Sequence, residues 1–376
     1  MSERTNRWIR DTHELAHLAE RLAGVPVAFD LEADSFHHYR EKICLAQVSW
    51  PDGEALIDPL DGAKLGALRP LLEDPGTRKI LHGADYDLRL LDRDHGIRVR
   101  GLFETMIASR LVGERAFGLA ALLERYFGVR LDKTHQRADW SQRPLPPVLE
   151  EYALEDTRHL HRLAVVLEGE LERLGRRGWA EEEFGRIEEV RWSRPDPSDP
   201  PAWTRVRGAA SLDAVGCGVL RALHAWREAR AQRRDVPPFR VLGEDPLVEL
   251  ARRRPSGKDG LRAVPHFPAA LAASAADEIL AAIRAGELAP AEPPAVRRLR
   301  RPAPSPATAI QDRLRAARDR VAVELDLEPS LLANRRVLEA VGERLLEGRT
   351  WDDVPDLRRW QAEVLRERFT AAARGG

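Results

Sequence analysis

Two proline-rich, polar segments divide this chain of 376 residues and limit what it can fold into. They are SRPDPSDPP (193–201) and APAEPPAVRRLRRPAPSPA (289–307). Proline neither continues a helix nor donates to a sheet, so such runs are semi-extended spacers. We therefore expect three folded pieces joined by two linkers. The pieces are 1–192, 204–288 and 308–376, and the linkers are 193–203 and 289–307.

The composition is that of folded domains. Hydrophobic residues make up 43% of the chain and charged residues 32%, which is enough to fill more than one core and too apolar for a disordered chain. The two cysteines exclude a disulfide scaffold and suit a reducing cytoplasm. No apolar run reaches the roughly 18–20 residues of a membrane span, and the N-terminus lacks a signal-peptide core. We expect a cytoplasmic protein with no membrane partner.

The net charge of −1 conceals an uneven distribution. Of the chain's 60 basic and 61 acidic side chains, residues 1–192 carry 28 basic and 35 acidic ones. Residues 193–376 carry the other 32 basic and 26 acidic ones. An acidic front half is therefore joined to a basic back half. Only five of the basic residues are lysines, which indicates coding bias, so arginine content alone does not predict nucleic-acid binding.

The first piece alternates strand and helix patterns. Short apolar runs of strand length lie at 27–31, 43–50, 55–58 and 79–82. Helical patterns follow them, including a long one from Pro147 to about Leu174. This order predicts a mixed sheet flanked by helices. The two later pieces have apolar residues at helical spacing and are expected to be all-α.

Two acids share one face of the first predicted strand. Side chains alternate in a strand, so Asp30 and Glu32 of FDLE point the same way. Paired carboxylates repel each other and are costly to desolvate, and a bound Mg²⁺ or Mn²⁺ would relieve both problems. A strand end in water would also accommodate two acids, so this pair alone leaves both interpretations open.

A second pair of acids follows a strand that stops at Gly83, in the segment LHGADYD. Both lie near a predicted helix N-terminus, where capping and the helix dipole favour acids by roughly 0.5–2 kcal/mol. That role suffices for Asp85 and does not require a second acid. Asp87 is therefore the better ligand candidate.

A tyrosine and an acid lie on one face of the long predicted helix. Tyr152 and Asp156 are four residues apart and hence one turn from each other. Taken alone, a half-buried tyrosine tied to a surface acid is the commoner interpretation. With the acids before it, the pair completes an ordered set.

This set resembles the DEDD 3′–5′ exonucleases of the subtype with tyrosine in the last motif. FDLEADSF, HGADYDL and YALEDTRHL match the three motifs of that family in order. The segments GLFETMIASRLVG and THQRADWSQRPLP look like those of ribonuclease D and its exosome-associated relatives, although Glu104 stands where Asp is common. The resemblance covers about residues 20–175 and implies a ribonuclease H-like α/β domain.

The resemblance also implies a mechanism. Asp30, Glu32, Asp87 and Asp156 match the metal-ligand acids, and Tyr152 matches the residue that positions and helps activate the attacking water. Two divalent cations, Mg²⁺ or Mn²⁺, and no organic cofactor are implied. The implied reaction is stepwise hydrolysis from the 3′ end of RNA, with tRNA precursors and other structured RNAs as substrates and nucleoside 5′-monophosphates as products.

The basic back half resembles HRDC domains, the helical modules of helicases and ribonuclease D. Residues 204–287 carry a helix ending in WRE, then DVPP and VLGEDPLVELARRRP, and residues 308–376 look like a second, degenerate copy. The resemblance implies a role in holding nucleic acid, and arginine–phosphate contacts would make the affinity salt-sensitive. Taken one at a time, a solvated charge at a helix end is the commoner interpretation of each candidate. The candidates are Arg233, Arg234, Arg252, Arg253 and Arg254.

Four more residues are expected near the site. His82 and Gln47 are candidate substrate contacts, but His82 also fits a structural histidine and Gln47 a residue facing a neighbouring strand. Gln136 is a candidate contact from a loop near the site. Trp140, in the same loop, is better explained as its anchor than as a stacking platform.

Two other functions remain open at this stage. The acids would serve a DNA 3′–5′ exonuclease equally well, because recognition of the 2′-hydroxyl is not visible in the sequence. A catalytically inactive RNA-binding protein is a third interpretation, and the complete acid set with Tyr152 argues against it.

Overall fold

The computed structural model describes residues 6–132, 134–194, 196, 198–294 and 306–374. The chain forms two compact units. Unit 1 consists of Met1–Glu32, Ile43–Trp192 and Arg300–Gly376, and unit 2 of Ala33–Lys42 and Ser193–Leu299. The central residues of the second spacer, 295–305, lie outside the described residues.

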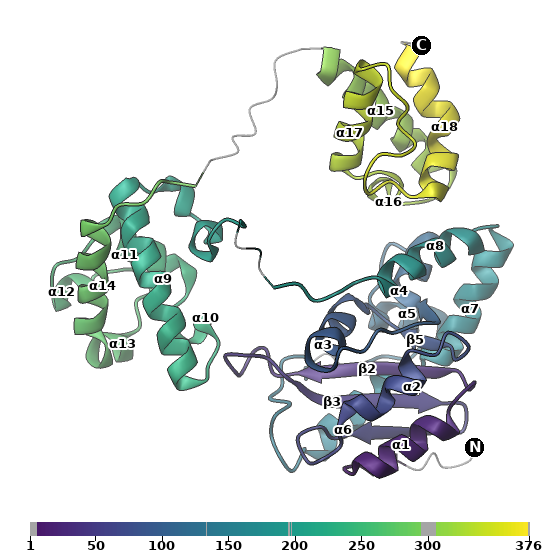
Figure 1. The fold of residues 1–376 in the computed structure, drawn as a ribbon, viewed down its shortest axis with the longest axis horizontal. Helices are drawn as coiled ribbons and strands as arrows, with labels where there is room; N and C mark the ends of the chain where they lie inside the picture. The colour runs from purple at the N-terminus through teal and green to yellow at the C-terminus, as the bar shows by residue number, and fades with distance from the viewer. Residues whose placement is uncertain (1–5, 133, 195, 197, 295–305, 375–376) are drawn as a thin grey trace. The chain divides into compact units, whose positions relative to one another are not determined.

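Unit 1 is built on a six-stranded mixed sheet with helices on both faces (Figure 1). The strand order is β1-β4-β3-β2-β5-β6. Strand β4 pairs in parallel with β1 and antiparallel with β3, and β5 pairs in parallel with β2 and β6. The predicted fold class is confirmed. The strands are β1 (Asn6–Ile9), β2 (Val27–Ala33), β3 (Ile43–Trp50), β4 (Gly53–Ile57), β5 (Lys79–Leu81) and β6 (Leu102–Glu104).

The long helix that the sequence predicts in the sheet domain is two helices in the structure, and α1 and α8 were not predicted. The expected helix from Pro147 to Leu174 is broken at His159. The carbonyl of Thr157 accepts the Ser49 hydroxyl at 3.0 Å, and Nε2 of His161 lies 2.9 Å from the Ser49 carbonyl, so the break is fastened to β3. The elements are α1 (Thr12–Arg21), η1 (Leu65–Leu68), α2 (Arg69–Leu72), α3 (Asp85–His95), α4 (Thr105–Leu111), α5 (Leu119–Phe127), α6 (Pro147–Arg158), α7 (Leu160–Arg173) and α8 (Arg177–Glu188).

Unit 1 also contains the four last helices, which share a hydrophobic core with the sheet domain. Leu163 and Leu167 of α7 and Phe184 of α8 belong to the same buried cluster as Leu314 and Leu365. The C-terminal helices are α15 (Pro306–Glu324), α16 (Pro329–Leu332), α17 (Arg335–Leu346) and α18 (Arg359–Arg374).

Unit 2 is helical and has a core of its own, centred on α9. Leu220 and Leu223 of α9 are fully buried with Ile279 of α14. Its elements are η2 (Ala202–Arg205), η3 (Ala209–Ser211), α9 (Ala214–Arg234), α10 (Pro238–Val241), α11 (Glu244–Arg253), α12 (Lys258–Arg262), α13 (Ala269–Ser274) and α14 (Ala276–Leu288).

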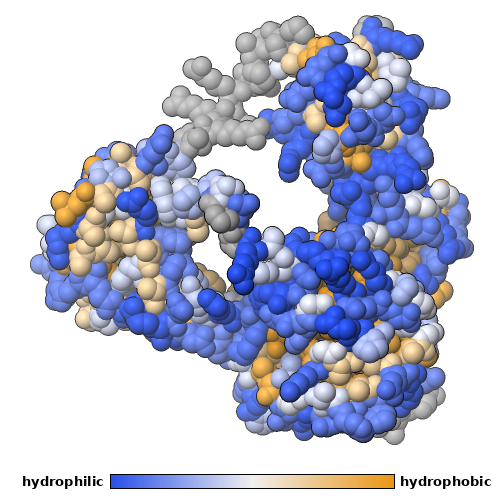
Figure 2. Space-filling view, viewed as in Figure 1, coloured by the Kyte–Doolittle hydropathy of each residue, from blue (hydrophilic) through white to orange (hydrophobic). Residues whose placement is uncertain are grey.

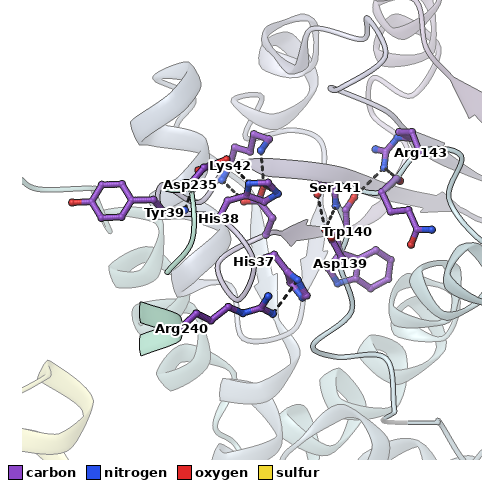
Figure 3. A network of polar contacts seen from close by, with 12 residues as sticks. His37, His38, Tyr39, Lys42, Asp139, Trp140, Ser141, Arg143, Asp235 and Arg240 are labelled. Atoms are coloured by element: carbon purple, nitrogen blue, oxygen red, sulfur yellow. Dashed lines mark hydrogen bonds and ion pairs between the residues drawn. The ribbon is translucent and has the colours of Figure 1, made fainter. Parts of the chain in front are cut away.

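Unit 2 includes the loop that follows β2. In this loop His38 Nδ1 lies 2.6 Å from Asp235 Oδ2, and the backbone N–H of Tyr39 donates to Asp235 Oδ1 at 3.2 Å (Figure 3). The Tyr39 hydroxyl donates to Glu228, and the ring of Phe36 lies edge-on to Phe239. The segment between two strands of the sheet is thus fastened to the end of α9.

Figure 2 shows hydrophobic residues in small groups on a largely hydrophilic face. Among the described residues, no helix is both long and apolar enough to cross a bilayer.

Candidate active site

The acids of β2 and α6 meet on one face of the sheet. Ala28 of β2 lies in the core with α7, and Asp30 and Glu32 follow it on the same face at the two-residue spacing of a strand. Helix α6 contacts β3, the neighbour of β2, and carries Asp156. Asp30, Glu32 and Asp156 each offer a carboxylate oxygen within 4.8 Å of the others.

Asp87 is the third residue of α3, and its side chain is buried. It does not belong to the tight group of three oxygens, but its charge raises the pKa of both Asp30 and Glu32. Asp85, two residues earlier, is exposed and pairs through both carboxylate oxygens with Arg89. The structure therefore separates the two acids, but Asp85 does not cap α3, whose N-cap is Ala84 with no side-chain hydrogen bond.

The negative charges of the four carboxylates repel one another. Burial is the main cause that raises the pKa of Asp30, followed by the charges of Asp87, Asp156 and Glu32. Burial likewise raises the pKa of Glu32, Asp87 and Asp156. Oxygens that share a Mg²⁺ ion at about 2.0–2.1 Å lie roughly 3–4 Å apart, so the group of three fits a divalent cation after small movements. A cation would also offset the repulsion.

Tyr152 lies one turn before Asp156 on α6, and its ring contacts two other aromatic rings. Its ring centroid is 5.8 Å from that of His135, nearly perpendicular, and 5.9 Å from that of Trp140. Burial, then the charges of Asp156, Glu32 and Asp30, raise the pKa of the phenol well above its usual value. The phenol therefore keeps its proton at neutral pH and faces the same acids.

The sequence matches known proteins along its whole length. A family model described as 3′–5′ exonuclease matches residues 6–172, and an HRDC domain model matches residues 218–283. A ribonuclease D of Gluconacetobacter diazotrophicus is 32% identical over 374 residues, which cover 98% of this chain and 92% of that protein. The chain belongs to the ribonuclease D family. The expected family and the first HRDC region are thus confirmed.

Other ribonuclease D proteins show the same relation. That of Pseudomonas paraeruginosa is 31% identical over 96% of this chain and 95% of its own length. The crystal structure of Escherichia coli RNase D, described as an exoribonuclease involved in structured RNA processing, superposes with a TM-score of 0.72 at 25% identity. It covers 99% of both chains. The arrangement of a ribonuclease D extends through both helical regions.

The polar candidates beside the acids lie in different environments. His82 Nδ1 lies 2.9 Å from the Thr105 hydroxyl, whose own proton goes to the Leu81 carbonyl, so Nδ1 of His82 donates. Burial lowers the pKa of His82 to about 4. Gln47 is fully buried on β3, and neither of its amide atoms has a partner in the described part of the chain. Gln136 is exposed in the loop before α6.

The candidate arginines of unit 2 are exposed, except Arg254, which is half-buried. Arg233 pairs with Glu278, Arg254 with Asp213, and Arg252 and Arg253 both pair with Glu249. These pairs are compatible with either interpretation of the arginines, because a surface pair contributes little and can be exchanged for a phosphate.

Two supporting residues were not predicted from the sequence. Glu104 begins α4 and its carboxylate accepts the N–H groups of Gly83 and Ile107, which fixes the turn that leads into α3 and Asp87. Arg143 binds Asp58 with two parallel hydrogen bonds. Glu104 is 21 residues from Gly83 and Arg143 is 85 residues from Asp58, so no local pattern predicts these two contacts.

Proposed function

We propose that this ribonuclease D removes nucleotides one at a time from the 3′ ends of structured RNAs, tRNA precursors among them. Water adds across the terminal phosphodiester, the bond from phosphorus to the 3′ oxygen breaks, and a nucleoside 5′-monophosphate leaves. The observation that carries the proposal is the convergence of three carboxylate oxygens within 4.8 Å beside Asp87 and Tyr152.

Asp30, Glu32, Asp87 and Asp156 would hold two divalent cations. The tight group of three supports one position, and Asp87, which acts on Asp30 and Glu32 from outside that group, supports a second. When bound, such cations supply Lewis acidity at the scissile phosphodiester. The carboxylates bind hard cations through oxygen and leave them a net positive charge to meet phosphate.

Tyr152 would orient the attacking water. The phenol O–H of Tyr152 can donate a hydrogen bond to that water. The rings of His135 and Trp140 limit how far the phenol can turn. Tyr152 would thus orient the attacking water, while the acids would bind the cations that offset the negative charge of the phosphate.

The arginines of unit 2 would hold the RNA body while its 3′ end is trimmed. Each phosphate that an arginine neutralises on single-stranded RNA contributes about 0.7 to the slope of log affinity against log salt. Replacing Arg233, Arg234, Arg252 and Arg253 by alanine should lower that slope by about 0.7 for each arginine that binds a phosphate. An unchanged slope would show that these four arginines do not bind RNA phosphates.

The central test uses three 5′-labelled substrates with Mg²⁺ or Mn²⁺: single-stranded RNA, DNA of the same sequence, and a tRNA precursor with a 3′ trailer. We expect a ladder of products shortened by single nucleotides, with RNA preferred over DNA. Asp30→Asn should slow the reaction by more than about 100-fold, since even residues that only support metal ligands cost 10–100-fold.

The matched control is Asp85→Asn, which removes an exposed acid two residues from Asp87. It should leave the rate within about twofold, because Asp85 pairs with Arg89 and not with the cluster. A laddered DNA product with intact RNA would favour a DNA exonuclease instead. Intact RNA and intact DNA would favour the inactive binding protein.

A further inference from the structure

The loop between α5 and α6 carries the two rings that contact Tyr152, yet its described residues form no helix or strand. His135 and Trp140 both belong to this loop, and both contact the Tyr152 ring. Trp140 is almost fully buried, and its indole N–H has no hydrogen-bond partner among the described residues. The indole is therefore held by its packing in a buried cluster with Leu56 and Leu145 and by the position of the loop backbone.

Every N–H of the Arg143 guanidinium donates a hydrogen bond, and two of these bonds hold the loop backbone. Its Nη1 donates to the carbonyls of Trp140 at 2.9 Å and Gln142 at 2.7 Å. Its Nη2 donates to the carbonyl of Cys44 on β3 at 2.7 Å. Five donors meet five acceptors, the other two being the oxygens of Asp58 at 2.6 and 2.7 Å. Figure 3 shows Arg143 beside Trp140 and Ser141.

Asp58 fixes the other end of this contact to the sheet. Its side chain is fully buried just after β4, and Oδ1 also accepts the N–H groups of Leu60 and Asp61 at 3.0 and 3.2 Å. A buried carboxylate is costly unless it is paired and hydrogen-bonded, and bidentate pairing with arginine is the strongest arrangement. The pair is therefore a rigid connection between the sheet and the loop.

We propose that Arg143 and Asp58 are positioning residues for hydrolysis and act through Tyr152. They hold the loop so that Trp140 and His135 keep the phenol directed at the acids. This inference rests on the proposed role of Tyr152. Neither Arg143 nor Asp58 belongs to the group of acids that would bind cations. Their replacement should therefore change the chemical step and leave cation binding intact.

The test is a double-mutant cycle on 5′-labelled single-stranded RNA. Arg143→Lys keeps the charge but cannot supply the two parallel bonds, and Asp58→Asn keeps the shape but loses the charge. We expect each to lower kcat about 10- to 100-fold, the cost of a misplacement near 1 Å, with KM and Mn²⁺ affinity within about twofold. In a Tyr152→Phe background the same changes should lower kcat less than about threefold.

The control is Arg130→Lys, at an exposed arginine that follows α5 and pairs with Glu124. It should leave kcat unchanged. A fall in kcat of equal size with and without Tyr152, an unchanged kcat, or a weakened affinity for Mn²⁺ would each overturn the inference. If Arg143→Lys does not fold by circular dichroism, Asp58→Asn decides, and if neither folds the pair is structural and the inference is overturned.

The two proposals fail in different ways. If the unmodified chain does not shorten RNA, the proposed function is wrong whatever the variants do. If it shortens RNA and Arg143→Lys does so equally well, only the positioning role is refuted.

Discussion

The two helical regions that follow the exonuclease domain are similar in length and pattern but differ in where their cores lie. Helices α9–α14 enclose their own buried cluster. Helices α15–α18 bury their apolar faces in a cluster that continues into α7 and α8 of the exonuclease domain. A proline-rich spacer therefore predicts where one folded segment ends and the next begins, but it does not predict whether the two segments have separate hydrophobic cores.

Specific contacts fasten the last helices to the exonuclease domain. The indole rings of Trp179 and Trp360 stack at 4.7 Å, and Trp360 Nε1 donates to Glu183 at 2.9 Å. Glu183 also pairs with Arg358 at 3.0 Å. Arg176 donates to the carbonyls of Leu111 and Leu325 at 2.7 and 2.6 Å, so it joins the two parts through their backbones.

The largest expected effect tests the shared core. Trp360→Ala should lower the unfolding free energy by about 3–5 kcal/mol, because it removes a buried ring and takes one hydrogen-bond donor from the Glu183 carboxylate. Hydrogen exchange against urea should show α8 and α18 destabilised together. Faster exchange in α15–α18 with α8 unchanged would mean that the C-terminal helices are independent after all.

The counterpart in unit 2 is Leu223→Ala. Leu223 is fully buried on α9, and its truncation should cost about 2–5 kcal/mol. The destabilisation should appear in α9–α14 and in residues 34–41, while the sheet of unit 1 keeps its protection. A sheet destabilised to the same degree would contradict the division into two cores.

A pH series distinguishes the units by a smaller effect. The pKa of His82 is about 4 in the folded chain, against about 6.5 unfolded. Between these values the unfolded chain takes up a proton that folded His82 does not, so the contribution of His82 to stability falls as pH falls, by about 2 kcal/mol at pH 5. His82→Asn should remove this decline in unit 1 and leave unit 2 unaffected. An identical pH dependence in both proteins would refute it.

The smallest effect concerns the loop that joins unit 2. Asp235→Asn keeps a side chain that tolerates the left-handed backbone at φ 48° but removes the charge that faces His38. We expect the unfolding free energy to fall by less than about 1 kcal/mol, as for other exposed pairs. Faster amide exchange at Tyr39, whose N–H binds Asp235, would report it. Unchanged amide exchange at Tyr39 would show that the contact with Asp235 does not hold this loop to unit 2.

The proposed metal-ligand acids could be predicted because each lies in a local pattern and the patterns together match the motifs of a known family. The two-residue spacing of Asp30 and Glu32 and the four-residue spacing of Tyr152 and Asp156 are properties of a single strand and a single helix. Asp87 was distinguishable from Asp85 because a helix N-terminus needs only one acid, which left the other as a candidate ligand. These arguments need no knowledge of which elements are neighbours.

The supporting contacts were not predictable, because they depend on tertiary neighbours. Strands β1 and β6 have four and three residues, too short for a periodic signal. The break at His159 depends on Ser49, 112 residues from His161. Arg143 lies in the segment THQRADWSQRPLP, but no local pattern predicts its contact with Asp58, and nothing local assigns the loop after Glu32 to the helical unit.

Anomalous diffraction from crystals soaked in Mn²⁺ tests the central claim most directly. We predict two peaks, with oxygens of Asp30, Glu32, Asp87 and Asp156 at about 2.0–2.3 Å from them, and the disappearance of at least one in Asp30→Asn. The contradicting result would be crystals with no peak at these carboxylates, grown from protein that shortens RNA in the same Mn²⁺ concentration.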